Sequence, residues 1–304
     1  MIAILGGLGA AVLWAAANLA SSRSSRMIGA SSALAWMMFV GLAVTAPFVP
    51  FAGPLPSLTP ILAFWLAASG LGSVIGLFFV YRGLRIGKVG PVLAIASTEG
   101  AIAAVVAVIA GEKLTIPVAV MLVVIAVGIA VVALATGDTA DAGEAAGEAT
   151  GGAPDSSPAT TKPRRGADRQ AALFGTAGAI AFGFSIYGTA QAGMSLPIVL
   201  AIMPARVTGV AFVFIPMALA GRLKMTRRAA PLVVITALGE VLGNAVYVLG
   251  ARESIAIAAV LACQYAAVGA VAAFFLFRER LSMLQRSGVA AIAVGVAILT
   301  AVRT

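Results

Sequence analysis

Residues 111–115 read Gly-Glu-Lys-Leu-Thr, and residues 278–282 repeat the pattern as Arg-Glu-Arg-Leu-Ser. A shift of 167 residues carries Glu112 onto Glu279. The same shift, without a gap, pairs Gly72 with Gly239, Gly76 with Gly243, Gly83 with Gly250, Arg85 with Arg252, Leu114 with Leu281 and Gly128 with Gly295. A constant shift over so long a stretch identifies an internal repeat, so the chain consists of two related halves.

The composition indicates a membrane protein. Of the 304 residues, 61% are hydrophobic and 10% are charged, whereas soluble domains carry about 25% charged residues. The apolar residues form blocks of about 20, the length of helix that crosses a bilayer. The alternating pattern of an outer-membrane barrel is absent. We therefore expect an all-α integral membrane protein that contacts the lipid bilayer.

The charge and the rare residue types exclude several functions. The formal net charge is +9, but the basic residues stand at the ends of apolar blocks, as the positive-inside rule predicts, so we expect no nucleic-acid partner. The absence of histidine excludes imidazole metal sites and histidine acid–base chemistry. The single cysteine, Cys263, allows no disulfide framework and is expected to be a packing residue. We expect no metal and no cofactor.

Ten apolar blocks are expected to be transmembrane helices. Their approximate bounds are 2–20, 31–50, 61–81, 90–110, 117–136, 171–190, 197–220, 230–250, 254–277 and 286–302. No Lys or Arg precedes Arg23, so we interpret the first block as a retained span rather than a signal peptide.

A polar linker separates the two halves. Residues 137–170 are rich in Gly, Ala, Thr, Ser and Pro and hold six acidic residues, so they cannot bury a core and are expected to be disordered. The predicted domains are therefore a five-helix repeat at 1–136 and a second at 171–304. Because five is odd, the second repeat must be inverted in the membrane relative to the first, as in many secondary transporters.

The distribution of Lys and Arg predicts the orientation. One side of the membrane collects Arg23, Arg26, Arg82, Arg85, Lys88, Lys162, Arg164, Arg165, Arg169, Arg222, Lys224, Arg227, Arg228, Arg278, Arg280 and Arg286, whereas the other has only Lys113, Arg252 and Arg303. The positive-inside rule places the first group and the linker in the cytoplasm. Both termini are then expected on the opposite side.

Outside the linker the chain has five acidic residues, which fall into two groups. Glu112, Glu253 and Glu279 stand at span ends, where ion pairing and helix capping are the favoured roles. Glu99 and Glu240 stand near the middle of apolar blocks, where a charge costs about 2.5–3.5 kcal/mol. Each could carry a proton or bind a cation, or be a neutral carboxyl that bonds a neighbouring helix.

Several other polar residues are expected near the two central glutamates. Glu240, Gly243, Asn244 and Tyr247 share one helix face. The chain has two GxxxG motifs, which begin at Gly72 and Gly239. Their glycines are expected to let helices approach closely. Arg206 could line a cavity and attract an anionic group, or extend to the interface. The predicted substrate-binding set is Trp14, Asn18, Glu99, Arg206, Glu240, Asn244, Tyr247 and Gln264.

The repeat, the span count and the signatures at residues 111–115 and 278–282 resemble the EamA-type members of the drug/metabolite transporter superfamily. Gly128 and Gly295 also stand where each repeat of that family usually has a glycine in its last span. The resemblance covers nearly the whole chain except the linker. It implies a secondary carrier that works by alternating access and commonly exports amino acids or other small metabolites, without ATP hydrolysis.

The expected function is transport of a small organic solute, such as an amino acid, metabolite or drug-like compound, out through the cell (inner) membrane. A proton or cation is a candidate coupling ion, and a homodimer is an open option. A membrane sensor or scaffold is the main alternative. A membrane-embedded enzyme acting on lipid-linked substrates is less favoured, because the acidic residues are few and scattered; we expect no enzymatic activity.

Overall fold

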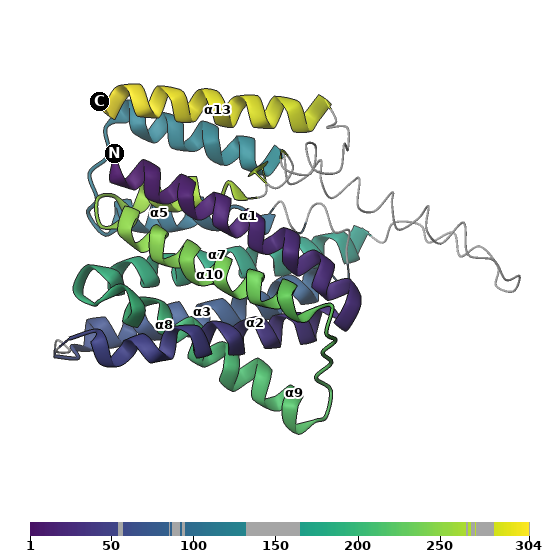
Figure 1. Cartoon of the computed structure of the whole chain (residues 1–304). Coiled ribbons are helices and arrows are strands. Elements are labelled where there is room, and N and C mark those ends of the chain that lie inside the picture. Colours follow the sequence, from purple (N-terminus) through teal and green to yellow (C-terminus); the bar gives the residue numbers. More distant parts are fainter. Residues whose placement is uncertain are drawn as a thin grey trace, which may run out of the picture.

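The structure, a computed structural model, describes residues 1–53, 57–84, 86, 92, 95–131, 165–265, 267–268, 271 and 283–303. Its elements in these ranges are helices (Figure 1). They are α1 (Ile2–Ile28), α2 (Ala30–Thr45), the 3-10 helix η1 (Ala46–Phe51), α3 (Pro60–Leu84), α5 (Glu99–Ile109), a helix at Ile116–Val131, α7 (Arg165–Ser195), α8 (Ile198–Gly209), the π-helical turn η2 (Val210–Phe214), α9 (Ile215–Leu219), α10 (Ala230–Ala251), α11 (Ile255–Ala262) and α13 (Met283–Arg303).

The helices have the length and composition of membrane spans. Within the described part of the chain, six helices are long and apolar enough to cross a bilayer: Ile2–Ile28, Ala30–Phe51, Pro60–Val80, Arg169–Ser195, Ile198–Leu219 and Ala230–Ala251. Large apolar side chains stay exposed on them, such as Phe64 and Phe78 on α3 and Leu173 on α7. The chain is therefore a multi-pass, all-helical membrane protein. The count of ten spans includes residues outside the described set and stays a prediction.

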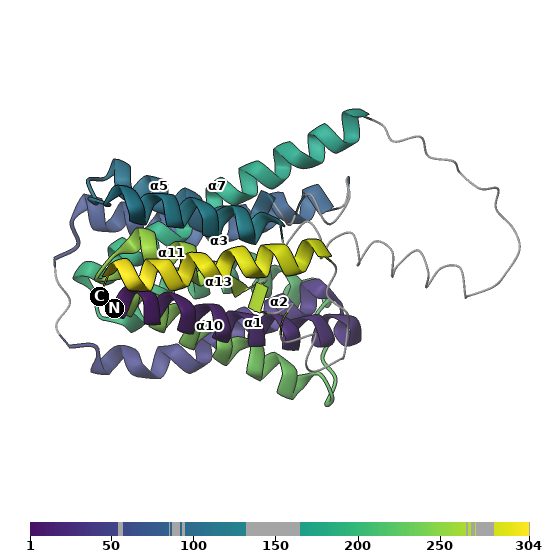
Figure 2. The same cartoon turned by 90° about the horizontal axis from the view of Figure 1, so that it is seen from above.

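The starts of α1 and α7 lie at opposite ends of the bundle. Figures 1 and 2 show the start of α1 and the end of α13 at one end, and the start of α7 at the other. α7 begins at Arg165, before the predicted start of the span at residue 171. Residues 137–164 of the predicted linker lie outside the described residues, as does Glu279.

Among the described helices, the two most extensive interfaces each join one helix from the first half of the chain to one from the second. α1 packs along α10, and α3 packs along α7. Glycines permit both approaches: a Cβ on Gly243 would lie 2.5 Å from the Trp14 ring, and a Cβ on Gly76 would lie 2.8 Å from the Phe182 ring. The packing role predicted for the GxxxG glycines is therefore confirmed.

These contacts correspond when the halves are exchanged. A shift of 167 residues pairs Gly76 with Gly243, and a shift of 168 residues pairs Trp14 with Phe182. Thus an aromatic ring of the first helix in each half covers a glycine of the third helix in the other half.

The last helices of the two halves show the same exchange. A Cβ on Gly128 would lie 2.9 Å from Ile292 Cγ1, and a Cβ on Gly295 would lie 2.6 Å from Ile125 Cγ1. Both residue pairs are related by the shift of 167. The two glycines therefore let the helix at Ile116–Val131 and α13 approach each other closely.

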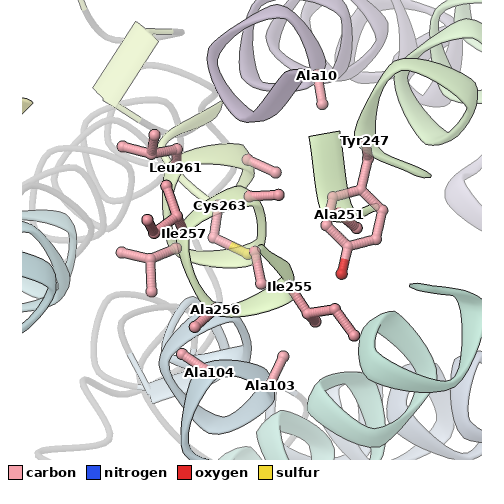
Figure 3. Packing of buried hydrophobic residues seen from close by; sticks show 14 of the residues in the cluster. Ala10, Ala103, Ala104, Tyr247, Ala251, Ile255, Ala256, Ile257, Leu261 and Cys263 are labelled. Atoms are coloured by element: carbon pink, nitrogen blue, oxygen red, sulfur yellow. The ribbon is translucent and has the colours of Figure 1, made fainter. Parts of the chain in front are cut away.

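α11 occupies the centre of the largest apolar cluster. All eight of its residues are buried, and Figure 3 shows its side chains between the alanines of α5, Ala10 of α1 and Tyr247 of α10. Small side chains on the surrounding helices make this close packing possible.

Two predicted spans are interrupted rather than continuous, which corrects the expectation for blocks 90–110 and 254–277. A turn at Ser97 and Thr98 precedes α5, which begins at Glu99, and a turn at Cys263 and Gln264 follows α11. Polar side chains stabilise the first turn, because Thr98 Oγ1 donates to the carbonyl of Ile95 at 2.7 Å. Broken helices near the midplane are typical of transporter binding sites.

Candidate solute-binding site

An ion pair between α8 and α10 forms the centre of the site. Arg206 Nη2 lies 3.4 Å from Glu240 Oε2, and Asn244 Nδ2 donates to the Glu240 backbone carbonyl at 2.7 Å and approaches Oε2 at 3.4 Å. The Arg206 side chain is 3% exposed and that of Glu240 is 26% exposed. The pair is thus closed on the arginine side and open on the carboxylate side.

α2 supplies the space in which Arg206 is buried. A Cβ on Gly41 would lie 3.2 Å from Arg206 Cδ, so a larger residue at this position would require the arginine side chain to shift by a few tenths of an ångström. Arg206 Nη1 also lies 3.7 Å from the sulfur of Met38. Arg206 therefore faces the bundle interior, and the alternative that it extends to the membrane interface is wrong.

Aromatic rings lie beside the ion pair. The Trp14 ring covers Gly243, which is adjacent in sequence to Asn244. Its centroid is 6.1 Å from that of Tyr247 and 6.2 Å from that of Tyr265. These rings form an apolar wall contributed by both halves of the chain, with α1 on one side and the region of α10 and α11 on the other.

Glu99 lies at the interrupted fourth span. It is the first residue of α5 and is 9% exposed. Tyr265 Oη lies 3.4 Å and Cys263 Sγ 3.8 Å from its Oε1 atom. The positive end of the helix dipole favours a carboxylate at this position.

The remaining predicted residues differ in their surroundings. The Tyr247 hydroxyl donates to the Ile186 carbonyl at 3.1 Å, so it fixes α10 against α7. Gln264 is buried at the turn after α11. Asn18 is exposed on α1, and no described contact links it to the ion pair. That these residues bind a solute stays a prediction.

The predicted substrate-binding set does not contain Met38 and Gly41, and the sequence gives Tyr265 only as a polar candidate of the ninth apolar block. Tyr265 follows Gln264 directly, so an interrupted span would have been the signal to include it. For Met38 and Gly41 no signal existed, because only the packing of α2 against α8 places them beside Arg206.

Two of the three glutamates at span ends, Glu112 and Glu253, bond the starts of helices, as expected. Glu112 Oε1 accepts a hydrogen bond from Ser254 Oγ, and its Oε2 accepts one from the Ala256 backbone N–H at 3.2 Å. The signature glutamate of the first half therefore caps the start of α11 in the second half. Glu253 Oε2 accepts a bond from the Ala3 backbone N–H at 2.9 Å.

A pocket of about 220 Å³ opens near these caps, at the end of the bundle where α1 starts. Its lining includes Glu112, Glu253, Tyr187 and Gln191. Gln191 Nε2 donates to the Tyr187 hydroxyl at 2.6 Å. Within the described ranges, no group of three or more acidic or cysteine side chains could hold a metal ion.

Comparison with known families shows a similarity in the first half of the chain. The model of the EamA-like transporter family matches residues 1–134. The first half of the chain is therefore similar to the EamA-like transporter family. The predicted resemblance to the EamA-type members of the drug/metabolite transporter superfamily is thereby confirmed, and that family is one of membrane transporters.

A solved structure shares the fold over nearly the whole chain. It is described only as "Crystal structure of protein", and the two are 17% identical with a TM-score of 0.72. The match covers 99% of this chain and 96% of the other. No curated protein matches the sequence.

Proposed function

We propose that the chain is a secondary transporter that carries a small organic solute, such as an amino acid, a metabolite or a drug-like compound. The observation that carries this proposal is the ion pair of Arg206 and Glu240, which lies within two apolar helices and keeps its carboxylate partly exposed. Charged groups within a membrane are costly, and where they occur they usually line a solute or ion pathway.

The interrupted spans support the same site. The turn before Glu99 and the turn after α11 fall at nearly equivalent positions of the two halves. Glu99 and Tyr265 therefore meet where broken helices of both halves come together. The arrangement suits a site between two inverted five-helix repeats, which would open alternately to the two sides of the membrane.

The direction and the coupling follow as further parts of the proposal. We propose export across the cell (inner) membrane, with a proton or cation exchanged through Glu240 or Glu99. The homodimer that the sequence left open is not needed for this mechanism, because the proposed site lies within one chain.

The test is flux through liposomes that contain the purified protein and a pH-sensitive dye. Amino acids, nucleosides and cationic drugs are added separately, and we expect at least one to produce a pH change. Glu240→Gln should abolish the change while the protein still inserts, and Glu240→Asp should retain part of it. A folded protein that moves no solute, or a pH signal unchanged in Glu240→Gln, would contradict the proposal.

A further inference from the structure

The buried side chains that lack a hydrogen-bond partner are all donors. In the described part of the chain, the buried side-chain nitrogen and oxygen atoms without a partner are Trp14 Nε1, Arg206 Nε and Gln264 Nε2. Native proteins rarely leave buried donors unpaired, because each then loses its bond to water without replacement. A group that satisfies these donors must bring acceptors.

Two of the donors belong to residues that contact neighbouring turns of α10. The edge of the Trp14 ring that carries Nε1 would lie 2.5 Å from a Cβ on Gly243. One turn earlier, Glu240 contacts Arg206. The two residues with unpaired N–H groups therefore contact α10 at positions three residues apart, and they come from helices of different halves.

The guanidinium is only partly used by Glu240. That contact involves Nη2 at 3.4 Å, which is long for a charge-assisted hydrogen bond. Nε remains unpaired, and the N–H groups of a guanidinium form a fork that fits a carboxylate or phosphate. Arg206 thus has capacity left for a second oxyanion.

The surroundings indicate an apolar body attached to that anion. The centroid of the Trp14 ring lies 6.1 Å from that of Tyr247 and 6.2 Å from that of Tyr265. Aromatic surfaces of this kind contact apolar or planar groups. A simple inorganic anion would leave this wall unused.

We propose that the transported solute is an organic oxyanion whose acid group accepts hydrogen bonds from Arg206 Nε and Trp14 Nε1. The inference rests on the proposed transport function and names its substrate class. The acid group competes with Glu240 for Arg206, while the body of the solute lies against the aromatic wall.

Binding is tested on the purified full chain carrying Trp36→Phe and Trp65→Phe. Trp14 is then the one tryptophan left of the three, so its fluorescence reports on the site. Benzoate, benzamide and benzylamine share a ring and differ in charge. We expect benzoate to bind at least tenfold more tightly than the other two, since hydrogen bonds to charged groups are the stronger ones. Acetate and inorganic phosphate should bind more weakly than benzoate.

Two variants test the donors separately by thermal stabilisation with benzoate. Arg206→Lys keeps the charge but removes Nε, and Trp14→Phe keeps a ring but removes Nε1. Each should weaken benzoate binding about tenfold. Trp65→Phe is the matched control, because Trp65 contacts Phe64 and Tyr187 outside the site and should leave binding unchanged.

The inference is overturned if benzylamine or benzamide binds as well as benzoate, if no oxyanion binds to the folded protein, or if Arg206→Lys leaves binding unchanged. Equal binding of inorganic phosphate and benzoate would overturn the claim that the solute has an organic body. Liposome flux separates this failure from failure of the proposed function: transport of amines or neutral solutes alone would leave a carrier with a different substrate class, whereas no flux of any solute would contradict transport itself.

Discussion

Arg206 Nη2 and Glu240 Oε2 lie 3.4 Å apart, and the two residues belong to helices that meet inside the second half of the chain. The arginine is almost fully buried, whereas about a quarter of the glutamate side chain is exposed. A buried cation needs this counter-charge, because removing it would leave the guanidinium without compensation in a medium of low dielectric constant. The pair therefore links helix packing to a carboxylate that remains accessible.

Replacing Arg206 by Met should lower the free energy of unfolding by about 1–3 kcal/mol, less than for a fully buried pair because Glu240 is partly exposed. Adding Glu240→Gln should recover part of the loss, since no unpaired charge then remains. Thermal unfolding in detergent measures the double-mutant cycle. Arg26→Met at the exposed end of α1 is the control, and strictly additive effects would contradict the pairing.

Gly243→Ala and Gly76→Ala form a matched pair of variants. Each added methyl group meets a ring, Trp14 in one case and Phe182 in the other. Overpacking of this kind should cost about 1–3 kcal/mol in both variants. Only Gly243→Ala should also change solute uptake, because it moves a ring of the proposed site. Equal uptake by the two variants at equal protein levels would show that Trp14 has no part in binding.

Glu112→Ala should destabilise the protein by about 1–2 kcal/mol, since it removes two hydrogen bonds at the start of α11. Ser254→Ala should cost about 1 kcal/mol, as is typical for the loss of an N-cap residue. The double variant should lose less than the sum, because the two side chains share one bond. Thermal unfolding measures these losses of stability. A loss in the double variant equal to the sum of the two single losses would contradict a shared cap.

A reporter that is active only outside the cytoplasm should be active when fused after Thr304. The prediction follows from the positive-inside rule. It agrees with the structure, in which the end of α13 and the start of α1 lie together and the start of α7 lies at the opposite end (Figures 1 and 2). A reporter that is silent there, but active when inserted between residues 140 and 160, would reverse the orientation.

Deletion of residues 140–160 should leave solute flux intact, because the proposed site lies in the helices. A scaffold protein would instead be expected to lose its partner through this deletion. Flux in liposomes and recovery of the protein from membranes are measured together. Loss of flux by a variant that inserts at the normal level would give the linker a role in transport.

The sequence predicts the class of the protein because hydrophobicity and repetition are local properties. Long apolar blocks require helices, since in lipid every backbone polar group needs an internal partner. The shift of 167 residues predicts two halves, and the glycines that it pairs take equivalent packing positions. The EamA-like family match at residues 1–134 agrees with the signature at residues 111–115.

The tertiary structure decides which polar residues meet. Arg206 and Glu240 are 34 residues apart, and Glu99 lies beside Tyr265 across 166 residues. The periodicity within a single helix cannot predict contacts between residues so far apart in the sequence. The packing angle and depth of each helix depend on the side chains of its neighbours. The helix breaks at Thr98 and Cys263 were likewise hidden, since long apolar stretches flank both turns. Hydrophobicity thus determines that segments enter the membrane, whereas close contacts between helices determine the chemistry inside it.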